Sequence, residues 1–150
     1  MTDSSRLVGA VVEALVDTVS DWPHVRQEEH RYGGTAFLVG SREIGHVHAS
    51  GMLDIPYLKA LRDRLVEAGE TREHHLLTNS GWTTFQIQSQ SDFEHARWLM
   101  RLSYLYHVRV LQQRGEHEFD DVDVDAELAA LDVSEEIRAA FERQEGRKAA

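Results

Sequence analysis

The sequence contains no cysteine, which excludes disulfide bonds, thiolate metal ligands and a cysteine nucleophile. It also lacks any apolar run near the roughly twenty residues that a membrane-spanning helix needs, and no basic-then-apolar segment of the signal-peptide type opens it. Basic residues are few: 16 Lys and Arg face 26 Asp and Glu, for a net charge of −10. This acidity disfavours nucleic acid and anionic membranes as partners, and we expect a cytoplasmic protein.

The patterns that are present predict a domain of the α+β class. At 150 residues with 41% hydrophobic content, the chain is long enough to bury a core. We expect an antiparallel sheet of about five strands, with helices packed mainly on one face. The predicted strands cover residues 25–30, 35–39, 42–49, 74–77 and 82–87, and the predicted helices cover 5–20, 56–68 and 91–107.

The composition changes near residue 115, where a run of aspartates precedes two short helical patterns. We therefore divide the chain into a domain over residues 1–114 and an acidic helical tail over residues 115–150. This C-terminal helical appendage is expected either to pack on the domain or to be partly mobile.

The segment Arg42–Ala49 is the first candidate for a functional site. As a strand it places Ile44, His46 and His48 on one face, because side chains alternate along a strand. Two imidazoles on one face can bind a metal ion, act as general bases near neutral pH, or be core histidines hydrogen-bonded to the backbone. If His74 and His75 lie in a strand, they point to opposite faces and only one joins the site; we favour His75.

Other residues near these histidines have side chains that suit a ligand pocket. Arg31 and Arg42 can bind an anionic or enolate oxygen, or form surface salt bridges instead. Asp54 can orient an imidazole, or cap a helix before Pro56, which suits a first helical turn. The aromatic rings of Tyr32 and Trp82 can form the walls of a pocket for a flat ligand, or belong to the core.

Five blocks of the sequence together carry a resemblance. They are residues 30–37 (HRYGGTAF), 42–48 (REIGHVH), 54–56 (DIP), 74–75 (HH) and 80–82 (SGW). Their order resembles the luciferase-domain family over about residues 22–107, a family that includes prokaryotic proteins and the luciferase of luminous fungi. The fungal enzyme oxidises a 3-hydroxy-α-pyrone with molecular oxygen through a peroxide, and needs no flavin or nucleotide. The family name by itself does not imply light emission.

The resemblance implies an enzyme that carries out cofactor-independent oxidation or proton abstraction on a small, flat, enolisable substrate, with oxygen as a co-substrate. No cofactor is expected, and a divalent transition metal is the alternative. Two other functions stay open, a non-catalytic module that binds a small ligand or a protein, and a metal-dependent enzyme that uses the H-x-H pair. The candidate site residues are His46, His48 and His75 for catalysis, and Arg31, Tyr32, Arg42, Asp54 and Trp82 for substrate binding.

Overall fold

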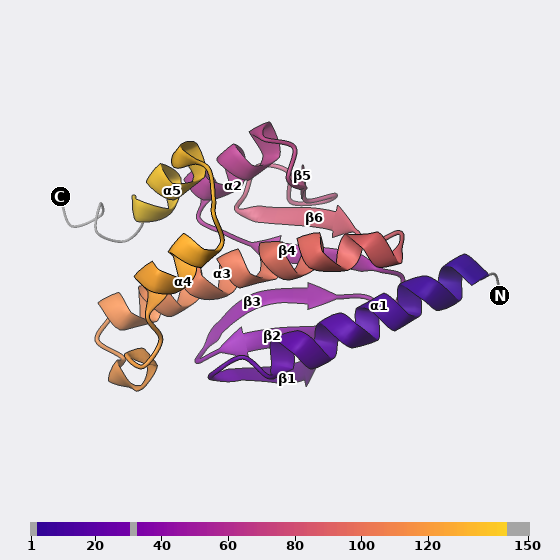
Figure 1. The fold of residues 1–150 in the computed structure, drawn as a ribbon, viewed down its shortest axis with the longest axis horizontal. Helices are drawn as coiled ribbons and strands as arrows, with labels where there is room; N and C mark the ends of the chain where they lie inside the picture. Colours follow the sequence, from indigo (N-terminus) through magenta and orange to yellow (C-terminus); the bar gives the residue numbers. More distant parts are fainter. Residues whose placement is uncertain (1–2, 31–32, 144–150) are drawn as a thin grey trace.

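A computed structural model describes residues 3–30 and 33–143. Its centre is a six-stranded sheet in which every neighbouring pair is antiparallel, in the order β1-β2-β3-β4-β6-β5 (Figure 1). The strands are β1 (Val25–Glu29), β2 (Thr35–Val39), β3 (Arg42–Val47), β4 (Met52–Pro56), β5 (Arg72–Glu73) and β6 (Trp82–Gln86).

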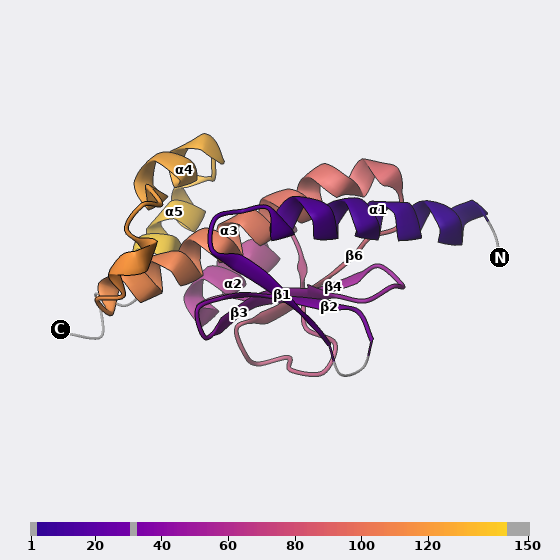
Figure 2. The ribbon, with the colours of Figure 1, turned by 90° about the horizontal axis from the view of Figure 1, so that it is seen from below.

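Two long helices cover one face of this sheet. They are α1 (Asp3–Ser20) and α3 (Phe93–Gln113), and Figure 2 shows both on the same side of the strands. The segment that joins β5 to β6 lies on the opposite side (Figure 2). The shorter helices are α2 (Lys59–Glu67), α4 (Val124–Ala130) and α5 (Glu135–Glu142), with 3-10 turns η1 (Gln90–Asp92) and η2 (His117–Phe119). None of the helices in the described ranges is long and apolar enough to cross a membrane.

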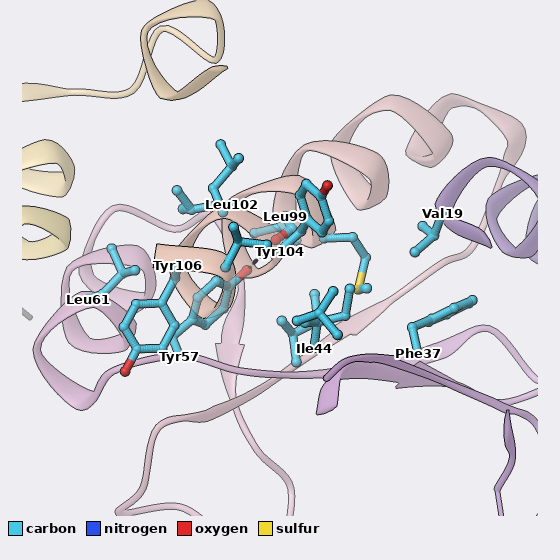
Figure 3. Close-up of a cluster of buried hydrophobic side chains, with 14 of the residues drawn as sticks. Val19, Phe37, Ile44, Tyr57, Leu61, Leu99, Leu102, Tyr104 and Tyr106 are labelled. Carbon is cyan, nitrogen blue, oxygen red and sulfur yellow. Dashed lines mark hydrogen bonds between the residues drawn. The ribbon is translucent and has the colours of Figure 1, made fainter. Parts of the chain in front are cut away.

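The hydrophobic core lies between α1, α3 and the sheet. Val11, Leu15 and Val19 are buried at four-residue spacing, so one stripe of α1 faces the strands. Ile44 points from the sheet toward α3, and Phe37 extends toward Val19 of α1 (Figure 3). Burying side chains of this size stabilises the fold by about 1.5–3 kcal/mol each. The sheet is therefore held rigidly on its helical face, and its other face is left for polar groups.

The α+β class and the helical layer are confirmed, and the sheet has six strands where about five were expected. Residues 52–56 form β4, where the sequence suggested a loop and a helix start at Pro56. Leu53 and Ile55 are fully buried on either side of a polar Asp54. This alternation is too short to identify a strand from the sequence. Residues 74–77 do not form a strand, and the short β5 ends just before them.

A β-bulge in β3 also overturns one prediction about the site. Phe37 pairs with Gly45 and Leu38 pairs with Glu43, so Ile44 is an extra residue without an opposite partner. The bulge changes the alternation, and Ile44 enters the core instead of sharing a face with His46. Gly45 suits the bulge because its φ is +152° and a Cβ there would lie 2.8 Å from the Met100 sulfur of α3.

The C-terminal segment packs onto the rest of the molecule. Phe119, Leu128, Ile137 and Phe141 are buried and belong to the same hydrophobic cluster as the core of the sheet. Helix α4 contacts α3, and α5 contacts α2 (Figure 1). Of the two expectations for residues after 115, packing on the domain is therefore observed up to residue 143. Whether residues 1–114 fold without the tail stays a prediction.

Candidate functional site

Three neighbouring strands each place one polar side chain on the sheet face opposite α1 and α3. His46 of β3 pairs with Asp54 of β4, and Asp54 pairs with Thr84 of β6. Leu53 and Ile55, which flank Asp54, are buried in the core. Because side chains alternate along a strand, His46, Asp54 and Thr84 form a row across the other face.

The Asp54 carboxylate is the centre of a histidine cluster. Its Oδ2 atom lies 3.2 Å from Nε2 of His46 and 3.5 Å from Nε2 of His48. His74 Nε2 lies 3.6 Å from the same oxygen. On the other side, the Thr84 hydroxyl donates a 2.8 Å hydrogen bond to Oδ1. Only 2% of the Asp54 side chain is exposed, so this buried carboxylate depends on its partners for compensation.

His46 is held between two carboxylates. Its Nδ1 donates to Glu43 Oε2 at 2.6 Å, and its Nε2 faces Asp54. Burial alone would lower the pKa of His46, but the hydrogen bonds to Asp54 and Glu43 raise it to about 9. Burial likewise opposes ionisation of Asp54, yet hydrogen bonds from His46 and Thr84 lower the pKa of that carboxyl to about 2. Both ring nitrogens of His46 are engaged, which makes it a poor general base.

His74 and His75 both face the cluster, contrary to the expectation for two successive strand residues. They follow β5 in an irregular segment, and their rings stack with centroids 4.2 Å apart. Nδ1 of His74 accepts hydrogen bonds from the backbone N–H groups of Leu76 and Leu77, each at 3.0 Å. The His74 proton must therefore be on Nε2, which faces Asp54. Burial lowers the pKa of His74, in agreement with a neutral ring.

Hydrogen bonds also fix the tautomer of His75. Its Nδ1 lies 3.3 Å from the Thr84 hydroxyl oxygen, whose own proton goes to Asp54. That oxygen can only accept, so Nδ1 of His75 carries the proton and Nε2 keeps its lone pair. The His75 side chain is 41% exposed, the most accessible of the imidazoles around Asp54.

Two further aromatic rings border the cluster. His30, which follows β1, stacks on His46 with centroids 4.0 Å apart. Burial, together with the nearby charge of His46, lowers the pKa of His30. The Trp82 ring of β6 lies 5.5 Å from the His46 ring and 6.0 Å from the His74 ring. These rings form one aromatic wall beside Asp54.

The structure brings most, but not all, of the candidate residues together. His46, His48, His75, Asp54 and Trp82 gather at the cluster. Arg42 does not: its Nε donates to Nδ1 of His107 in α3, away from the cluster. Arg31 and Tyr32 lie outside the described residues.

His74 was passed over in favour of His75, and three further residues of the cluster were not selected from the sequence. The bulge turns Glu43 toward His46, and the sequence pattern does not reveal a bulge. Thr84 is an ordinary strand residue that no motif singles out. His30 stood in the first of the resembling blocks, residues 30–37, and that membership is the signal that could have identified it.

The sequence comparisons agree with this picture. Residues 41–103 match the family model of the luciferase domain. The match confirms the luciferase-domain resemblance. The matched segment contains the strands that carry His46, Asp54 and Thr84, and also the loop with His74 and His75. No curated protein matches the chain.

Proposed function

We propose that this protein is an enzyme that abstracts a proton from a small, flat, enolisable molecule, with His75 as the general base. The observation that carries the proposal is the hydrogen-bonded chain from His75 through Thr84 to Asp54. It presents the lone pair of Nε2 on an exposed ring and links the opposite nitrogen to a buried carboxylate. This is the arrangement by which a third group orients a catalytic base.

The surroundings of His75 support a flat substrate. Trp82 offers a ring face on which a planar molecule can stack, and His48 is a second imidazole that a ligand can reach, with 24% of its side chain exposed. When His75 takes a proton, the Asp54 carboxylate stabilises the resulting imidazolium through Thr84. The luciferase-domain match supports an enolisable substrate, since the reaction that it implies begins from an enol and uses molecular oxygen.

The test measures proton abstraction directly. Hydroxypyrones and cyclic α-hydroxyketones are incubated with the protein in D₂O, and exchange of carbon-bound hydrogen is followed by NMR while an electrode records oxygen uptake. We expect His75→Asn, which keeps a donor toward Thr84 but has no base, to reduce exchange by roughly 10²–10⁴-fold. Thr84→Val should also lower the exchange rate, whereas Thr84→Ser should retain it because the hydroxyl is kept.

His117→Ala is the matched control, because His117 is exposed and far along the chain, where it pairs only with Asp120 among the contacts described. Its exchange rate should equal that of the parent protein. If no compound exchanges or consumes oxygen, yet some bind, the protein is a ligand-binding module. Equal rates for the parent and His75→Asn would refute the role of His75.

A further inference from the structure

The strongest unexplained feature of the cluster is the convergence of three potential metal ligands on one point. In His46, His48 and Asp54, one nitrogen or oxygen atom from each residue lies within 4.8 Å of the others. Asp54 Oδ2 lies 3.2 and 3.5 Å from the two Nε2 atoms. Ligands about 2.0–2.2 Å from one ion are separated from each other by roughly 3.0–3.5 Å. The 3.5 Å separation of His48 is long for a hydrogen bond but fits such a ligand pair.

We propose that His46, His48 and Asp54 bind one divalent first-row transition-metal ion. Two histidines and one carboxylate on one side of an ion leave the remaining coordination positions open, an arrangement suited to Fe²⁺ and related ions. The H-x-H pair supplies one imidazole from β3, that of His46, and one from just after its end, that of His48, while β4 supplies the carboxylate opposite His46.

The groups around these ligands are those that a metal site requires. Nδ1 of His46 donates to Glu43, so the ring can release the Nε2 proton to an incoming ion and stay neutral, with Nε2 as the ligand atom. The Asp54 carboxylate is oriented by the hydroxyl of Thr84. Asp54 and Glu43 together supply two negative charges, which balance a divalent ion. The rings of His46 and His48 stand nearly perpendicular, at 85°, so both edges can approach one point.

A second trio, Asp54, His74 and His75, also satisfies the distance condition, but its hydrogen bonds exclude it. Nδ1 of His74 accepts from two backbone N–H groups, so its Nε2 carries a proton and cannot bind a metal. Nδ1 of His75 donates to Thr84. Of the imidazoles around Asp54, those of His46 and His48 therefore stay as the candidate metal ligands.

The experiment is equilibrium binding of Zn²⁺, and of Fe²⁺ without oxygen, to untagged full-length protein, by calorimetry and elemental analysis. The parent protein should bind one equivalent. His48→Gln and Asp54→Asn should weaken affinity at least 100-fold, and Glu43→Gln about 10–100-fold, because it loosens a ligand without removing one. Co²⁺ should give a visible absorption spectrum in the parent protein that is absent from His48→Gln.

Two variants make the result specific. His117→Ala should bind like the parent protein, which separates the site from weak binding by exposed histidines. His75→Asn should also retain the metal, because His75 is not a ligand. Binding at fewer than one equivalent, equal affinity in His48→Gln, or loss in His75→Asn would each overturn the proposal. Thermal melting verifies that each variant is folded, and Glu43, which is 30% exposed, gives a variant with little risk to the fold.

Metal binding does not depend on the proton abstraction proposed above. It is measured without substrate, whereas the exchange reaction is tested by His75 and Thr84 variants. Either proposal can therefore fail while the other stands.

Discussion

Replacing His107 with glutamine is expected to change how the stability of this protein depends on pH. His107 lies in α3, is only 5% exposed, and holds the ends of the two strands that carry His46 and Asp54. Its Nδ1 accepts from Arg42 at the start of β3, and its Nε2 donates to the Pro56 carbonyl at the end of β4. Burial, with repulsion from the Arg42 charge, lowers the pKa of His107 from 6.5 to about 3.

The sign of the effect follows from these two pKa values. The unfolded chain takes up a proton at His107 below pH 6.5, whereas the folded protein takes it up only near pH 3. The contribution of the neutral ring is therefore complete above pH 6.5 and is lost as the pH falls toward 3. At pH 5, about 1.5 units below the pKa of His107 in the unfolded chain, the free energy of unfolding is therefore about 2 kcal/mol lower than it is above pH 6.5.

His107→Gln is neutral at both pH values, so it lacks this acid-dependent loss. At pH 7.5 the variant should be less stable than the parent protein by about 1–3 kcal/mol, because the flexible Gln amide does not reproduce the ring geometry that bonds Arg42 and Pro56 together. At pH 5 that difference should shrink by about 2 kcal/mol. Urea unfolding followed by circular dichroism at both pH values measures it, with His117→Gln as the exposed control. Parallel pH dependence in the parent protein and His107→Gln would refute the reasoning.

Two further predictions concern the bulge and the tail. Gly45→Ala should lower stability by about 1–3 kcal/mol, since its Cβ would meet the Met100 sulfur and its φ is unfavourable for other residues. If that contact is the cause, the double variant Gly45→Ala/Met100→Ala should lose less stability than the sum of the losses in the two single variants. A chain that ends at Gln113 should melt at a lower temperature than the full chain, because it loses the buried rings of Phe119 and Phe141. An unchanged melting temperature would instead support a separable domain over residues 1–114.

Most of the fold was predictable because long periodic patterns dominate it. The stripe of α1 is visible in the sequence because its apolar residues recur at helical spacing, and β2 is visible as a short apolar run between glycines. β4 was missed because it is five residues long, has Asp54 at its centre and ends in Pro56, features typical of a loop before a helix. Its burial comes from tertiary packing between β3 and β6, which local propensity does not contain.

The site was predictable in part, for a related reason. The H-x-H spacing identified His46 and His48 because a strand keeps both on one face. Glu43 could not be identified, because its orientation depends on a bulge that exists where α3 approaches Gly45. His74 and His75 were assigned to opposite faces on the assumption of a strand, whereas an irregular segment lets both rings turn toward Asp54.

Asp54 links the two proposals through its two oxygen atoms. Oδ2 faces the imidazoles of His46 and His48, and Oδ1 accepts from the Thr84 hydroxyl, which in turn accepts from His75. If both proposals hold, the cation at Oδ2 and the base oriented through Oδ1 would share one buried carboxylate. A substrate oxygen at an open coordination position would therefore lie beside the base that removes the proton, so that the charge formed on the enolate is stabilised where it develops. In that case the histidine cluster would combine a metal-binding group on the β3–β4 side of Asp54 with a base on the segment that follows β5.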